Sequence, residues 1–128
     1  LIIGENRINL RSNLTTIEVQ DLLSRSKIAT LPSIVREGFP RAVVEAMSCG
    51  CATITSTSGG TPEAVSSSAI LLDDVNPNSI SDSLNLLTKD PDQIQIWGER
   101  ARKHAEQNLG LNSHIKKYDT VLEACVNA

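Results

Sequence analysis

Four short runs of mostly apolar and β-branched residues mark this chain, and each is bounded by polar or turn-forming residues. They cover residues 1–3, 27–31, 51–55 and 69–72. A run of this kind is typical of a strand buried on both faces of a sheet, because a strand with one exposed face would alternate apolar and polar positions. The pattern therefore predicts four buried strands.

The remaining segments have helical periodicity. Predicted helices cover residues 15–26, 40–50, 62–65, 77–88, 91–107 and 113–126. The first should begin at a capping box, because Glu18 follows Thr15 by three positions. Pro40 and Pro91 suit first turns, and Gly50 is a typical helix terminator. The apolar face of the second helix should consist of Ala42, Val43, Ala46 and Met47.

Alternating strands and helices imply one α/β domain with a doubly wound, Rossmann-like parallel sheet. A chain of 128 residues is long enough for one such domain. Ligands of these sheets bind at the carboxyl ends of the strands, beside helix N-termini. The segments 32–40 and 56–62 follow two predicted strands and are therefore the expected site.

Composition narrows the classes of function. The net charge is −3, basic runs are absent and Phe39, Trp97 and Tyr118 are the only aromatic residues. These features argue against nucleic-acid binding. No apolar run approaches the roughly 20 residues of a membrane-spanning helix. Three cysteines without C-x-x-C spacing predict neither zinc nor a disulfide framework but a reducing compartment, with Cys49 and Cys51 as small buried thiols.

The stretch from Glu37 to Glu45 carries the candidate chemistry. Gly38 lets the main chain approach a ligand, and the following helix N-terminus is an anion site to which Arg41 could add charge. The Glu37 carboxylate could accept hydrogen bonds from the hydroxyls of a sugar. Glu45 lies among apolar residues and should need donors, which a second diol would supply. Together these features describe a nucleoside diphosphate sugar.

Taken singly, each feature also has an ordinary interpretation. Glu37 could be a solvated carboxylate favoured by the helix dipole, and Glu45 could lie on the outer face of its helix. Arg41 could point to solvent, and Gly59-Gly60 could be a common turn. The combination is what favours a ligand site.

The combination resembles the C-terminal donor-binding domain of group 1 retaining glycosyltransferases, which are similar to family 4 and have the GT-B fold. The resemblance rests on Glu37-x7-Glu45 with Gly38-Phe39-Pro40 inside it, on Glu45-Ala46-Met47-x-x-Gly50, and on Gly59-Gly60-Thr61-Pro62-Glu63. It covers essentially the whole chain, so the domain 1–128 is expected to be a nucleotide-sugar-binding domain, incomplete at its N-terminal edge and without the acceptor domain.

The resemblance implies a role for each matching residue. Glu37 would be the catalytic residue, holding hydroxyls of the transferred sugar. Glu45 would bind the ribose diol. The donor would also be contacted by the main chain or side chains of Gly38, Phe39, Pro40, Arg41, Ala42, Val43, Gly59 and Gly60. Pro40 departs from the glycine of many members and removes one possible backbone donor.

The implied reaction is retaining transfer of a hexose-type sugar to a glycan or lipid-linked acceptor, as in polysaccharide biosynthesis. It needs no metal and no cofactor besides the donor substrate. The expected location is the cytoplasm, with peripheral association at the inner membrane face as an addition. The isolated chain should be inactive. One alternative is a non-catalytic nucleotide-sugar-binding module. A second is a phosphoacceptor receiver domain, but the sequence lacks the acidic cluster of such a domain. A dinucleotide enzyme would need the motif G-x-G-x-x-G, which is also absent.

Overall fold

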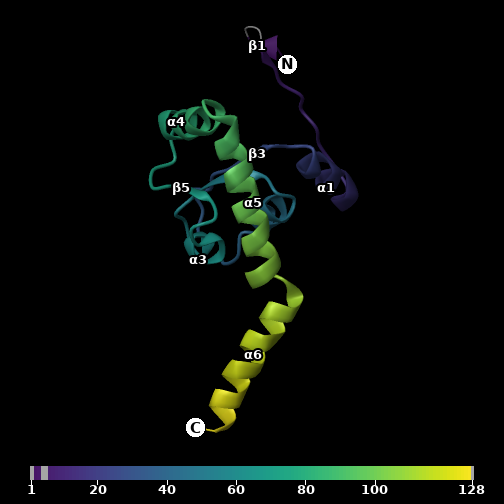
Figure 1. The fold of residues 1–128 in the computed structure, drawn as a ribbon, viewed down its shortest axis with the longest axis vertical. Coiled ribbons are helices and arrows are strands. Elements are labelled where there is room, and N and C mark those ends of the chain that lie inside the picture. Colours follow the sequence, from purple (N-terminus) through teal and green to yellow (C-terminus); the bar gives the residue numbers. More distant parts are fainter. Residues whose placement is uncertain (1, 4–5, 128) are drawn as a thin grey trace.

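The computed structural model describes residues 2–3 and 6–127. Its elements in chain order are β1 (Ile2–Ile3), β2 (Asn6–Arg7), α1 (Thr16–Ser24), β3 (Ile28–Leu31), α2 (Arg41–Ser48), β4 (Ala52–Ser56), α3 (Thr61–Val65), β5 (Ile70–Leu72), α4 (Pro77–Thr88), α5 (Pro91–Asn108) and α6 (Leu111–Val126). All six predicted helices are present, and three of the four predicted strands form the central sheet (Figure 1).

The central sheet has the order β3-β4-β5, and both pairs of strands are parallel. Ile54 in the middle strand is in register with Thr30 on one side and Ile70 on the other. Parallel neighbours need a crossover connection, and here α2 and α3 supply the two crossovers. The predicted α/β class with a parallel sheet is confirmed.

The prediction that residues 1–3 form a buried strand of this sheet is wrong. Ile2 and Ile3 pair antiparallel with Arg7 and Asn6 instead. A two-residue strand this close to a second one closes a local hairpin, which needs no crossover to the main sheet. Figure 1 shows this hairpin away from the sheet, at the end of an extended segment. Leu1 lies outside the described residues.

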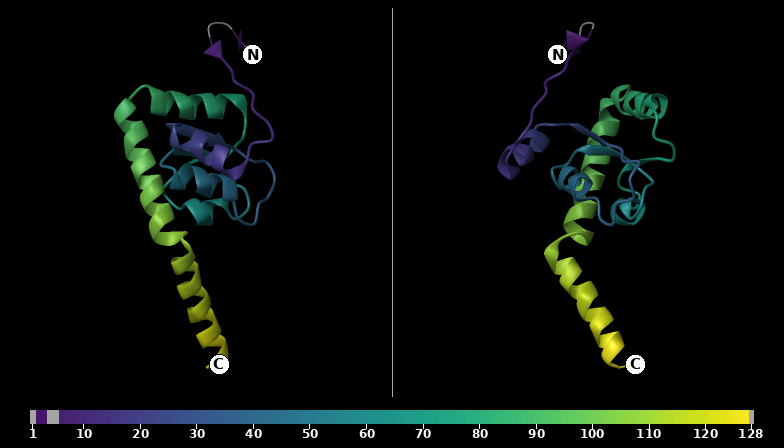
Figure 2. Two further views of the ribbon diagram at one scale, coloured as in Figure 1. Left: turned by 90° about the vertical axis from the view of Figure 1, so that its right-hand side faces the viewer. Right: turned by 180° about the vertical axis from the view of Figure 1, so that it is seen from behind.

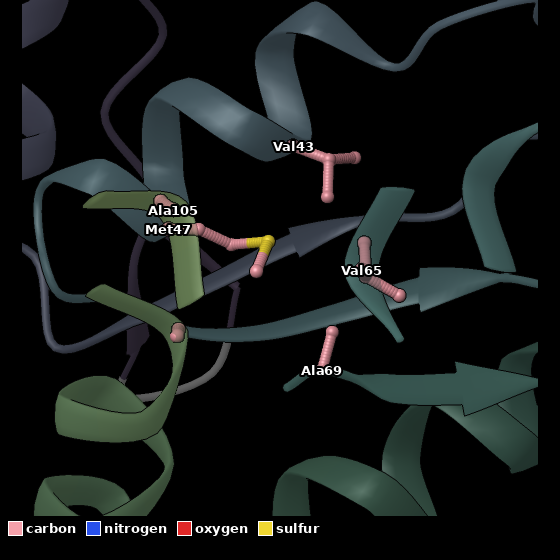
Figure 3. Close-up of a cluster of buried hydrophobic side chains, with 6 residues drawn as sticks. Val43, Met47, Val65, Ala69 and Ala105 are labelled. Atoms are coloured by element: carbon pink, nitrogen blue, oxygen red, sulfur yellow. The ribbon is translucent and has the colours of Figure 1, made fainter. Parts of the chain in front are cut away.

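Helices cover both faces of the sheet, as a doubly wound arrangement requires. On one face, Ile54 and Leu72 pack with Leu87 of α4 and with Ile94 and Trp97 in the first half of α5. The opposite face is covered by α2, α3 and the second half of α5. Its buried cluster, drawn in Figure 3, comprises Val43, Met47, Val65, Ala69, Ala101 and Ala105.

α5 reaches both faces because it passes close to the start of β4. A Cβ atom at Gly98 would overlap the carbonyl oxygen of Gly50, so only glycine allows this approach. Gly50 itself has φ +80° and follows the C-cap residue of α2, Cys49, which confirms the predicted terminator. These two glycines let α2, β4 and α5 meet at the amino edge of the sheet.

Helices α2 and α6 differ in how much of their surface is buried. Val43, Ala46 and Met47 of α2 are buried as predicted. Ala42 is exposed, because it lies on the same outer face of the helix as Glu45, three residues further on. α6 has no buried residue and extends away from the rest of the molecule (Figures 1 and 2).

Candidate functional site

Two loops at the carboxyl edge of the sheet are tied together by hydrogen bonds. Ser56 Oγ, at the end of β4, donates to the Ser33 carbonyl oxygen at 2.6 Å and accepts from the Ser33 N–H at 2.9 Å. Ser58 Oγ donates to the Val35 carbonyl oxygen at 2.8 Å. The Gly60 N–H donates to the Glu37 carbonyl oxygen, also at 2.8 Å. The β3–α2 loop therefore has its backbone held by the β4–α3 loop.

Gly59 and Gly60 make this close approach possible. A Cβ atom at Gly59 would overlap the backbone of Glu37, and one at Gly60 would overlap the Gly38 carbonyl oxygen. Gly59 also has φ +59°, a conformation that favours glycine. The sequence motifs predicted that this glycine pair lines the donor site. They did not indicate that the pair packs against the backbone of Glu37 and Gly38. Adjacent glycines directly after a buried strand were the available signal.

The N-terminus of α2 lies next to this junction and carries no side-chain cap. The Arg41 N–H donates to the Phe39 carbonyl oxygen, and the first intrahelical bond runs from the Val44 N–H to the Pro40 carbonyl oxygen. The N–H groups of Ala42 and Val43 lie between these two bonds, in the helical turn whose donors have no intrahelical acceptor. The helix dipole adds positive potential, so this end of α2 suits an anion.

The two glutamates flank the open helix end, Glu37 before it and Glu45 a little over one turn (about 3.6 residues) inside it. Both side chains are exposed. The expectation that Glu45 lies in a water-poor environment is wrong, because Glu45 is on the outer face of α2 while Val43, Ala46 and Met47 face the core. An exposed carboxylate needs no protein donor and stays accessible to a ligand.

Glu45 lines a groove of about 220 Å³ between α1 and α2. Thr16, Gln20 and Leu23 form the α1 side of this groove, and the polar groups of the first two lie opposite the carboxylate-bearing face of α2. No local sequence signal indicates that these α1 residues lie near Glu45, because their proximity depends on how the two helices pack.

A larger cleft, of about 690 Å³, adjoins the other side of the β3–α2 loop. It lies at the carboxyl ends of β4 and β5. Its lining includes Arg36, Thr57, Gly59, Leu72, Asp73 and Asp74. Glu37 and Glu45 do not line it. Asp73 and Asp74 follow β5 directly, which is a signal for this edge of the sheet that sequence reasoning did not use.

Phe39 connects the β3–α2 loop to the last helix. Its ring is 44% exposed and meets the His114 ring edge-on, with centroids 6.1 Å apart and an interplanar angle of 73°. His114 lies in the first turn of α6, so that helix begins beside the candidate site. Arg41 is exposed and takes part in neither of the two ion pairs found among the described residues.

The cysteines lie away from the open end of α2. Cys51 is buried, Cys49 is half-buried and Cys125 is exposed. Burial, with the neighbouring Cys49 as a smaller cause, raises the pKa of the Cys51 thiol. Its Sγ lies 3.3 Å from the Leu23 carbonyl oxygen of α1, as a thiol donor would. The prediction of a buried thiol is confirmed for Cys51, while Cys49 keeps partial exposure.

Within residues 2–3 and 6–127, no three His, Cys, Asp or Glu residues are grouped so that they could hold a metal ion. In the same part of the chain, no helix is both long enough and apolar enough to cross a membrane.

The segment that contains these loops and helix α2 matches a known protein family. Residues 4–104 match the model of the family "Glycosyl transferases group 1". The match extends over most of the chain, and the chain therefore belongs to this family, as the sequence motifs predicted.

Two curated relatives illustrate the family. The chain is 30% identical over 111 residues to the N,N'-diacetylbacillosaminyl-diphospho-undecaprenol α-1,3-N-acetylgalactosaminyltransferase of Campylobacter jejuni, covering 83% of this chain and 29% of the relative. It is 29% identical over 122 residues to the MMP α-(1→4)-mannosyltransferase of Mycolicibacterium hassiacum, covering 93% of this chain and 29% of the relative. The chain thus spans less than a third of the length of these relatives.

Among solved structures, the sucrose-phosphate synthase of Thermosynechococcus elongatus is similar, with a TM-score of 0.60 and 18% sequence identity. The similarity covers 72% of this chain and 24% of that one. At this identity the comparison bears on the fold alone, and it confirms the predicted Rossmann-like α/β fold.

Proposed function

We propose that this chain is the donor-binding part of a retaining glycosyltransferase and that it binds a nucleoside diphosphate sugar. The observation that carries the proposal is the uncapped N-terminus of α2 between two exposed carboxylates, Glu37 and Glu45. An anion site with a hydroxyl-binding group on each side matches the order of sugar, diphosphate and ribose in such a donor.

Each part of the donor has a chemically suited partner. The diphosphate would accept hydrogen bonds from the N–H groups of Ala42 and Val43. The Glu45 carboxylate would accept hydrogen bonds from both hydroxyls of the ribose. The adjoining groove between α1 and α2 would hold the rest of the nucleoside. The Glu37 carboxylate would accept hydrogen bonds from hydroxyls of the transferred sugar. The main chain of Gly38 and Phe39 would lie beside that sugar.

In the reaction, the chain's own groups act by positioning and by electrostatics. As the bond to the sugar breaks, negative charge develops on the leaving diphosphate, and the fixed dipole of α2 stabilises it without reorganisation. Glu37, held through its backbone by Gly60, would fix the sugar in the reactive orientation. The proposal requires no metal ion.

The names of the two relatives support transfer of a hexose-type sugar, since one is an N-acetylgalactosaminyltransferase and the other a mannosyltransferase. A glycan or lipid-linked acceptor would be held by a further domain of a longer protein. We therefore expect the 128-residue chain alone to bind donor without transferring sugar. Robust transfer by the purified chain would contradict this part of the proposal.

Calorimetry tests the donor site. Titrating the chain with UDP, GDP and ADP should reveal binding of at least one of them, and Glu45→Ala should weaken it about tenfold, the loss expected for hydrogen bonds to a charged group. Glu123→Ala, which removes an exposed glutamate from α6, is the matched control and should bind like the parent. Equal affinities for all three proteins would refute the ribose assignment.

A further inference from the structure

We propose that Gln20 of α1 recognises the base of the donor nucleotide and selects a pyrimidine. This inference rests on the proposed function, because it assigns the part of the donor that lies beyond the ribose at Glu45. Gln20 is exposed on the α1 wall of the groove whose α2 wall carries Glu45. Its carboxamide has no hydrogen-bond partner within the part of the chain that the structure describes.

One face of α1 forms its wall of the groove. Thr16, Gln20 and Leu23 all line the groove, and their helical spacing places them on that face. Leu23 packs against the same buried cluster as Cys49 of the opposite wall, so this part of the groove is apolar. Thr16 and Gln20 are therefore the polar groups that α1 offers to a ligand.

The α1 wall is held in place at both of its ends. Cys51 Sγ lies 3.3 Å from the Leu23 carbonyl oxygen and 3.4 Å from the Ser26 carbonyl oxygen, which ties the end of α1 to the start of β4. The Thr15–Glu18 capping box fixes the first turn of α1. Gln20 lies between these two fixed points, so its backbone is ordered before a ligand binds, which lowers the entropic cost of binding.

The length of a nucleoside matches the separation of the two walls. The axes of packed helices lie about 8–10 Å apart. The ribose hydroxyls and the hydrogen-bonding edge of the base lie at opposite ends of a nucleoside, so a ribose held at Glu45 directs the base towards α1. Ser48 Oγ already donates to the Val44 carbonyl oxygen at 2.8 Å, which leaves Thr16 and Gln20 to donate to the base.

A carboxamide suits a base edge on which a donor lies beside an acceptor, because it offers one carbonyl oxygen and one NH₂ group. Uracil presents its N3–H beside a carbonyl oxygen, and cytosine presents its amino group beside N3. Guanine presents two adjacent donors, the N1–H and the 2-amino group, which a carboxylate would pair better. Among the described residues that line the groove, Glu45 is the one carboxylate, and it is assigned to the ribose.

Adenine also has a donor beside an acceptor, and its size distinguishes it from the pyrimidines. The groove has a volume of about 220 Å³. Pockets for small molecules typically have volumes of roughly 300–1,000 Å³. The small volume of this groove favours the single ring of a pyrimidine over the two fused rings of a purine.

Calorimetry of the 128-residue chain with UDP, CDP, ADP and GDP tests the inference. UDP or CDP should bind more tightly than either purine nucleotide. Gln20→Glu should lower the ratio of UDP to GDP affinity about tenfold. The new carboxylate would repel the accepting atom of a pyrimidine, whereas it could accept from both guanine donors. Partial unfolding or the added negative charge would weaken all four nucleotides alike and leave this ratio unchanged.

Gln107→Glu is the matched control, because it makes the same change at an exposed position of α5 outside the groove. It should leave the ratio of UDP to GDP affinity as in the parent. Tighter binding of ADP or GDP than of both pyrimidine nucleotides by the parent would overturn the assignment of a pyrimidine. An unchanged ratio in Gln20→Glu would overturn the role of Gln20.

The variant Glu45→Ala separates this inference from the proposed function. Weaker binding of all four nucleotides by Glu45→Ala, together with an unchanged ratio in Gln20→Glu, would refute the base assignment and leave the donor site standing. If none of the four nucleotides bound the parent chain, the donor site would be refuted, and the assignment of Gln20 with it.

Discussion

Helices α2 and α4 begin in equivalent places, each after a loop at the carboxyl edge of the parallel sheet, yet their first turns differ. At the start of α4, Asn76 Oδ1 accepts from the N–H groups of Asn78 and Ser79 at 2.9 Å, and Ser79 Oγ accepts from the Asn76 N–H in return. α2 begins at Pro40 without any side-chain cap.

The difference shows two uses of the same helix dipole. α4 satisfies its first-turn donors within the chain and gains stability from doing so. No side chain caps the first-turn donors of α2, and the adjacent loop that contains Gly59 and Gly60 packs against the residues before the helix. The proposed diphosphate site therefore differs from the start of α4 because no side chain caps its first-turn N–H groups.

The largest effect is expected from Gly60→Ala, which disturbs the support of the open end. The added Cβ would overlap the Gly38 carbonyl oxygen, and relieving such overpacking should cost about 2 kcal/mol of the free energy of unfolding. Urea denaturation would measure this loss, and UDP binding should disappear with it. Gly110→Ala is the control, because a Cβ there makes an ordinary contact, 3.5 Å from the Glu106 carbonyl oxygen. Equal stability of the two variants would contradict the structural role of Gly60.

A smaller effect is expected from Asn76→Ala, which makes the start of α4 resemble that of α2. Loss of the cap should lower the free energy of unfolding by about 1 kcal/mol, and Asn76→Ser, which keeps a capping hydroxyl, should recover most of it. Asp74 and Asp82 flank the start of α4 at the same eight-residue spacing as Glu37 and Glu45, but no glycine pair holds the loop before α4 against a second loop. Neither variant should therefore create a UDP site. Tight UDP binding gained by Asn76→Ala would show that an open helix end suffices by itself.

The smallest effect concerns Cys51, just beyond the other end of α2. Its folded-state pKa is raised by burial, so the unfolded chain loses the thiol proton first as the pH rises past the ordinary value of 9.0. The free energy of unfolding should therefore fall in that range, and Cys51→Ala should remove this part of the decline. Cys125→Ala, at an exposed thiol, should decline like the parent protein. Urea titrations at several pH values would reveal the difference, and identical slopes for both variants would contradict the burial effect.

Much of the fold was accessible from local sequence signals. Pro91 lies in the first turn of α5, the Thr15–Glu18 capping box begins α1, and Gly50 has the left-handed conformation of a terminator. Pro40, also predicted in a first turn, is instead the N-cap residue of α2, one position earlier. These features act within a few residues of one another, which is why the sequence alone reveals them.

The errors concern features that depend on distant parts of the chain. The apolar run at 1–3 does not determine which strand it pairs with. The exposure of Glu45 depends on which face of α2 meets the sheet, and the contact of Gly60 with Gly38 depends on how two loops pack. The candidate donor residues were predicted by motif, whereas Arg36, Asp73 and Asp74 emerged only once β4 and β5 were side by side.

One titration tests the central claim most directly. Amide NMR of the ¹⁵N-labelled chain with UDP should show the Ala42 and Val43 N–H resonances moving saturably, in the direction of stronger hydrogen bonding, while those of Asn78 and Ser79 at the capped start of α4 stay in place. Unmoved resonances at Ala42 and Val43, or equal shifts at both helix starts, would contradict the assignment of α2 as the diphosphate site.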